Sequence, residues 1–117
     1  MIIVYGIPNC DTIKSARAWL TDHALPHSFH NYKKSGVPTD LLPLWVEAIG
    51  SHALLNRQGS TWRKLDVAAQ EAASADAGAM ALMVAQPSVI KRPVVDWGNG
   101  IVTVGFASTA WALRLSD

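Results

Sequence analysis

We expect the rest of the chain to fold around one segment, Ile2-Ile3-Val4-Tyr5-Gly6-Ile7-Pro8-Asn9-Cys10-Asp11-Thr12-Ile13-Lys14. Residues 2–5 are β-branched or aromatic without polar alternation, a pattern typical of a central strand buried on both faces. A glycine and a proline then end that strand. Apolar residues recur at helical spacing at Ile13, Ala16 and Leu20, which predicts an amphipathic helix that begins at Cys10 or just after it. The one cysteine of the chain is therefore placed at a helix N-terminus.

The position of Cys10 allows two interpretations. Unpaired N–H groups in the first turn of a helix, together with the helix dipole, stabilise an anion there, and a thiolate is such an anion. These surroundings can lower a cysteine pKa from about 8.5 to roughly 3.5–7.5, which makes the thiol nucleophilic at neutral pH. Lys14 can add its charge, whereas Asp11 acts against the thiolate. The alternative is an inert, buried cysteine, as most free cysteines are.

The middle of the chain is predicted to be mainly helical. A second strand is expected at 27–31, after Pro26, and would pair with the first one in parallel through the intervening helix. A helix follows, and the residues expected in its apolar stripe are Leu41, Leu44, Trp45, Ala48 and Ile49. Residues 51–86 show helical propensity and no strand pattern, which indicates a small helical insertion between two parts of a sheet.

The last third of the chain predicts a hairpin and a helix. Residues 94–95 and 101–104 are β-rich and flank an Asn99-Gly100 pair, which is a strong signal for a tight hairpin. The final helix offers three residues for packing, Trp111, Leu113 and Leu115. Together these elements predict an α/β fold with a four-stranded mixed sheet flanked by helices.

Length and composition indicate a single domain over residues 1–117. Half of the residues are hydrophobic, 16% are charged and the formal net charge is +1, so neither disorder nor direct binding of nucleic acid is expected. One cysteine excludes an internal disulfide, and neither a signal peptide nor a membrane-spanning apolar run is recognised. We therefore expect a cytoplasmic, monomeric protein without membrane contact. The histidines are too scattered to predict a metal site.

Three blocks of sequence carry a family resemblance. They are Gly6-Ile7-Pro8-Asn9-Cys10-Asp11-Thr12-x-Lys14-x-Ala16-Arg17-x-Trp19-Leu20, then Asn56-Arg57-x-Gly59-x-Thr61-x-Arg63-Lys64-Leu65, and then Pro87-Ser88-Val89-Ile90-Lys91-Arg92-Pro93-Val94. The chain resembles the arsenate reductase-like (ArsC/Spx/YffB) family of the thioredoxin superfamily, and the YffB-type proteins most of all. The resemblance covers essentially the whole chain. It implies a thioredoxin-like fold with a helical insertion, roughly 51–86, between strands 2 and 3.

The resemblance also implies roles for individual residues. Cys10 is the nucleophile, and the amides after it and Thr12 hold its thiolate. Arg57 and Arg92 match two positions that bind the oxyanion and stabilise the thiolate in ArsC-type reductases, roles that suit a guanidinium. Pro93 matches a cis-proline that faces the cysteine, with an ordinary trans-proline as the plain alternative. The expected binding site is completed by Asn9, Asp11 and Lys14.

Departures from the arsenate reductase pattern narrow the expected activity. The third arginine of those enzymes is missing from 104–108, and Gly6-Ile7 stands where they have a histidine. Arsenate is therefore not the expected main substrate. Position 13 is isoleucine, so the Cys-x-x-Cys switch of many Spx-type regulators cannot form. A single thiol needs a second thiol from outside the chain.

These features predict a glutathione-linked thiol reductase that acts through Cys10. Glutathione is the expected co-substrate, either glutathione or a glutaredoxin-like protein supplies the second thiol, and no bound cofactor is expected. Two alternatives stay open. One is an Spx-like regulator that binds RNA polymerase without turnover, and the other is residual arsenate reduction.

Overall fold

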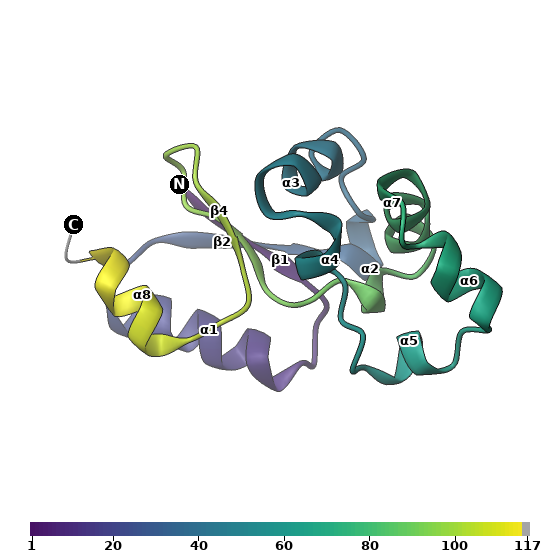
Figure 1. The fold of residues 1–117 in the computed structure, drawn as a ribbon. Coiled ribbons are helices and arrows are strands. Elements are labelled where there is room, and N and C mark those ends of the chain that lie inside the picture. Colours follow the sequence, from purple (N-terminus) through teal and green to yellow (C-terminus); the bar gives the residue numbers. More distant parts are fainter. Residues whose placement is uncertain (116–117) are drawn as a thin grey trace.

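The protein begins with a parallel β-α-β unit. The computed structural model describes residues 1–115, and Figure 1 shows this unit in purple and blue. Its elements are β1 (Ile2–Gly6), α1 (Asp11–Asp22) and β2 (His27–Asn31). β2 runs parallel to β1, with Val4 opposite Phe29. The prediction of this unit is confirmed, including the start of α1 directly after Cys10.

A hairpin completes the sheet. Its strands are β3 (Val94–Asp96) and β4 (Val102–Val104). β3 is antiparallel to β1, with Val95 opposite Val4, and β4 is antiparallel to β3, with Thr103 opposite Val95. The strand order is β2-β1-β3-β4. The predicted four-stranded mixed sheet is therefore confirmed, and β1 lies inside it with a neighbour on each side.

The chain between β2 and β3 is helical, as predicted. It contains α2 (Tyr32–Ser35), α3 (Leu42–Ile49), α4 (Ser51–Leu54), α5 (Ser60–Arg63), α6 (Val67–Ala72), α7 (Asp76–Ala85) and the 3-10 turn η1 (Pro87–Val89). In Figure 1, α5 and α6 lie beyond the sheet, on the right. Within residues 1–115, no helix combines the length and the apolar character needed to cross a bilayer.

The apolar stripe of α3 differs from the predicted one. Leu44 is 58% exposed, whereas Leu42, Trp45 and Val46 are buried. Residues 42, 45, 46 and 49 share one face of a helix, and residue 44 is turned by about 200° from residue 42. Placing Leu44 and Ala48 in the stripe was therefore wrong. Apolar residues occupy so much of α3 that spacing alone permits more than one stripe.

The sheet separates two hydrophobic clusters. Val4 and Val95 point toward α1 and α8 (Ser108–Leu115), whereas Tyr5 and Val94 point toward the inserted helices. Figure 1 shows α1 and α8 on one side of the sheet and α3 on the other. Burial of a large apolar side chain contributes about 1.5–3 kcal/mol. Packing on both faces thus holds the end of β1, and with it the loop that leads to Cys10.

Trp111 attaches α8 to the rest of the molecule. It is 3% exposed, and its ring lies edge-on to the rings of Trp19, Trp97 and Phe106. Leu113 is 66% exposed and Leu115 is 43% exposed. The expectation that these two leucines pack was wrong. Residue 113 is turned to the opposite side of the helix from residue 111, and residue 115 lies one turn beyond the aromatic cluster.

Candidate active site

Cys10 lies between the end of β1 and the first turn of α1. It is the N-cap residue, with extended backbone at φ −110° and ψ 126°, and its carbonyl accepts the N–H of Lys14 at 3.0 Å. Asn9 has a φ of 58°, in the left-handed region that asparagine tolerates better than most residues. Gly6 packs so closely against Ile13 that a Cβ would collide with the isoleucine side chain. The loop is therefore held tightly against the start of the helix.

The surroundings of Cys10 favour its thiolate. Partial burial raises the pKa of the thiol, but three groups together outweigh this effect. The backbone N–H groups of Ile13 and Thr12 donate to the sulfur, and the Arg92 guanidinium adds a hydrogen bond and a positive charge. As a result, the pKa of Cys10 lies below its usual value. Two of these groups come from the helix start, and the third comes from a distant part of the chain.

Arg92 reaches the thiol from the segment between η1 and β3. Its Nη1 donates to the carbonyl of Ser88 at 3.0 Å, which holds the guanidinium against its own loop. Its Nε is buried without a hydrogen-bond partner among residues 1–115. The peptide bond between Arg92 and Pro93 is cis. The cation beside Cys10 is therefore restrained by the backbone of its own segment.

A hollow of about 250 Å³ opens at the thiol. Its lining residues are Cys10, Thr12, Asn56, Lys91, Arg92 and Phe106. Asn56 and Lys91 come from two segments that pair with each other, since the N–H of Asn56 donates to Val89 and the N–H of Lys91 donates to Leu54, both at 2.7 Å. Backbone pairing, rather than sequence proximity, thus brings these two side chains to the thiol.

Three residues of this hollow were not predicted from the sequence. Asn56 and Lys91 belong to the second and third blocks that carry the family resemblance, and membership of those blocks was the available signal. Phe106 carried no such signal. It lies in 104–108, where the family resemblance led us to look for a third arginine, and its apolar ring lines the hollow instead.

Three expected site residues lie away from the thiol hollow. Asn9 and Lys14 line another hollow, of about 450 Å³, on the side of α1 that carries Arg17. Asp11 is exposed in the first turn of α1. Within the described chain, neither Asp11 nor Lys14 is among the groups that shift the pKa of Cys10. The expected competition between their charges is therefore not what determines the state of the thiol.

Arg57 also lies outside the thiol hollow. It lines a neighbouring hollow of about 420 Å³, and its guanidinium lies over the Trp62 ring, 5.5 Å from the centroid. The two hollows share Asn56 and Lys91. The structure thus brings Arg92, one of the two expected arginines, to the sulfur, and places Arg57 in the neighbouring hollow. A thiolate next to a cation, in an open polar hollow, is suited to attack on a disulfide or on an oxidised substrate.

Comparison with known proteins shows what the chain is similar to. A model of the ArsC family matches residues 5–113. The solved structure of a YffB protein is 44% identical, with a TM-score of 0.89 over 98% of this chain and 99% of that one. An arsenate reductase (ArsC) related protein from Brucella melitensis is 40% identical, with a TM-score of 0.76 over 99% and 95% of the two chains. The global transcriptional regulator Spx of Streptococcus pyogenes is 28% identical over 81% of this chain and 71% of its own length.

Proposed function

This chain belongs to the ArsC family, and from that premise we propose that it is a glutathione-linked thiol reductase with Cys10 as its nucleophile. The observation that carries the proposal is the position of the thiol, at the N-terminus of α1 and in an open hollow that Arg92 also lines. The fold is that of the arsenate reductase-like thiol oxidoreductases. Glutathione or a glutaredoxin-like protein would supply the second thiol, because Cys10 is the one cysteine of the sequence.

The reaction needs two exchanges of sulfur. The Cys10 thiolate attacks the glutathione sulfur of a mixed disulfide, its bond to that sulfur forms, and the substrate leaves as a thiolate that takes up a proton. A second glutathione thiolate then attacks the same glutathione sulfur. Oxidised glutathione leaves, and Cys10 returns to the thiolate. Arg92 favours the anionic form of Cys10 at the start and at the end of this cycle.

The proposal is tested first by the rate at which iodoacetamide alkylates Cys10 as a function of pH. No second cysteine competes for the reagent. We expect an inflection below the usual thiol value of about 8.5. An inflection at or above that value contradicts the proposal.

Turnover is tested by glutathione-dependent reduction of hydroxyethyl disulfide, coupled to NADPH through glutathione reductase. Cys10→Ser is the matched variant, because it retains a small polar side chain at the same helix start. Activity is expected in the wild type and absent in Cys10→Ser. Equal rates for the two proteins exclude Cys10 as the nucleophile.

Residual arsenate reduction is a weaker candidate. The hollow at Cys10 offers the cations of Arg92 and Lys91, but Phe106 gives it an apolar wall. Fewer donors to an oxyanion weaken its binding. NADPH consumption that depends on added arsenate, in the presence of glutaredoxin, would identify this activity. Consumption that is independent of arsenate would exclude it.

A role as a transcription regulator is the second candidate function. It is favoured by the identity with the Spx protein of Streptococcus pyogenes, which covers most of this chain. In this case the chain would bind RNA polymerase and would not turn over a substrate. Retention of polymerase subunits by both the wild type and Cys10→Ser would support it. Retention by the wild type but not by Cys10→Ser, or retention by neither protein, would argue against this role.

A further inference from the structure

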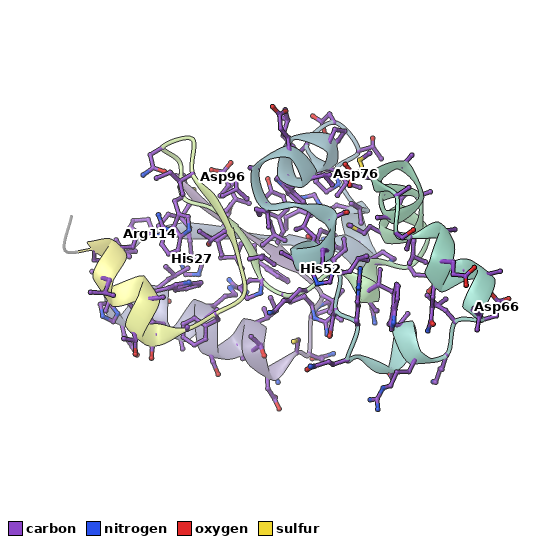
Figure 2. All side chains as sticks on the ribbon, viewed as in Figure 1. His27, His52, Asp66, Asp76, Asp96 and Arg114 are labelled. Carbon is purple, nitrogen blue, oxygen red and sulfur yellow. The ribbon has the colours of Figure 1, made fainter. Side chains whose placement is uncertain are left out.

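The hollow next to the thiol is rich in positive charge. Its lining consists of His52, Ala53, Leu55, Asn56, Arg57, Gln58 and Lys91, which include two permanent cations, an imidazole and no carboxylate. Figure 2 shows His52 near the centre of the molecule, whereas the labelled carboxylates Asp66 and Asp96 lie away from it. This hollow shares Asn56 and Lys91 with the thiol hollow, so the two lie side by side.

Local contacts hold Arg57 in place. The side-chain oxygen of Asn56 accepts the N–H of Gln58 at 3.2 Å, which closes a tight turn around Arg57. Gly59 approaches the Asn56 amide so closely that a Cβ there would need the amide to move. The Trp62 ring lies under the Arg57 guanidinium at 5.5 Å, a cation–π contact that favours one orientation of the side chain.

Helix α4 is fixed in a similar way. The hydroxyl of Ser51 donates to the Asp76 carboxylate at 2.8 Å, which ties the start of α4 to α7. The N–H of Leu54 donates to the carbonyl of Gly50 at 3.2 Å, and Leu54 is fully buried. His52 lies between these two attachments. His52, which lines the hollow, therefore lies on a short helix that is held at both ends.

We propose that this neighbouring hollow binds a carboxylate of the glutathionyl group whose sulfur reacts at Cys10, with Arg57, His52 and Lys91 as its binding residues. The inference rests on the proposed function. A forked guanidinium suits a carboxylate. One residue of an extended peptide spans about 3.3–3.6 Å, so a carboxylate one or two residues from the cysteine of a peptide reaches an adjoining hollow. Arg92 stays with the sulfur, and Arg57 holds the other end of the ligand.

The inference is tested with disulfides of different charge. Oxidised glutathione carries carboxylates, hydroxyethyl disulfide is neutral and cystamine is cationic. In each reaction the Cys10 thiolate attacks one sulfur, a mixed disulfide forms, the original sulfur–sulfur bond breaks and the second half leaves as a thiolate. The measured quantity is the rate with oxidised glutathione divided by the rate with hydroxyethyl disulfide, in wild type and in Arg57→Gln. Lys34→Gln on α2 is the charge-matched control, because Lys34 is exposed and lines neither hollow.

We expect Arg57→Gln to lower this ratio about threefold to tenfold, as for a charge-assisted contact at a partly exposed site. Arg57→Lys is expected to lie between the wild type and Arg57→Gln, because it keeps the charge and loses the fork. The corresponding ratio for cystamine should rise in Arg57→Gln. Lys34→Gln should match the wild type in both ratios.

Failure of the subsite and failure of the proposed function give different results. Rapid exchange with hydroxyethyl disulfide and the same ratio in wild type and Arg57→Gln would overturn the carboxylate subsite and leave the thiol chemistry standing. A fall of similar size in Lys34→Gln would also overturn it, because the effect would then come from net charge. Exchange no faster than that of a free peptide thiol with every disulfide would refute the proposed function and the subsite together.

Discussion

Trp111→Ala is expected to lower the free energy of unfolding by about 3–5 kcal/mol. Trp111 is 3% exposed, and its ring centroid lies 5.4, 5.0 and 4.6 Å from those of Trp19, Trp97 and Phe106. Alanine removes these contacts and leaves a cavity between α1, the hairpin and α8. Its higher helix propensity recovers less than about 0.7 kcal/mol. Because a domain of this size is stable by about 5–15 kcal/mol, the loss is a large share of the total.

Urea denaturation measures this loss. The transition should be followed by far-UV circular dichroism, because the substitution itself changes tryptophan fluorescence. With a slope of about 1–3 kcal/mol per molar urea, the midpoint is expected to fall by more than about 1 M. The slope must stay the same in both proteins for the comparison to hold.

Leu113→Ala is the matched control for this prediction. It lies on the same helix, but Leu113 is 66% exposed, so the expected change is within about 0.5 kcal/mol. Equal losses in the two variants would refute the argument that α8 is attached through Trp111. A loss of less than about 1 kcal/mol in Trp111→Ala would refute it as well, because the aromatic cluster would then contribute little to stability.

Three further predictions concern Arg92, Tyr32 and the thiol of Cys10. Arg92→Gln is expected to move the inflection of Cys10 alkylation to higher pH, because burial then opposes the thiolate with only two N–H groups to stabilise it; no movement would exclude Arg92 from this role. Tyr32→Phe is expected to change the free energy of unfolding by less than about 1 kcal/mol in urea denaturation, because the Tyr32 hydroxyl is buried without a partner among residues 1–115; a loss above about 2 kcal/mol would contradict this. The pKa of Cys10 is lower in the folded protein than in the unfolded chain, so its stabilising contribution is complete above the unfolded pKa and is lost as pH falls through the folded pKa. The stability of wild type relative to Cys10→Ser should therefore rise with pH across that window, and a flat difference in unfolding free energy would contradict the lowered pKa.

The sequence predicted the helices but not which of their faces are buried. The existence of α3 and α8 was predictable, but Leu44 and Leu113 proved to be exposed. Helical spacing identifies residues that share a face, and it does not identify which face meets the core when apolar residues occupy several. Trp111 is buried as expected, but the same expectation covered Leu113 and Leu115, and the sequence did not distinguish the three.

One part of the candidate site could be predicted from local sequence, whereas another part depends on residues that are distant in the chain. A helix that begins after Cys10 brings the N–H groups of Thr12 and Ile13 to the sulfur. The start of this helix could be predicted from one segment, in which a β-rich run and a turn are followed by apolar residues at helical spacing. The family resemblance pointed to both Arg57 and Arg92, without distinguishing their positions.

Only the tertiary structure decided that Arg92 stands at the thiol and Arg57 in the neighbouring hollow. That difference depends on the pairing of 54–56 with 89–91, two segments that are far apart in the chain. Local patterns determine strands, turns and helix starts, because the forces that form them act between residues close in sequence. Which side chains meet across such a pairing depends on how the whole chain packs, and no local pattern contains that information.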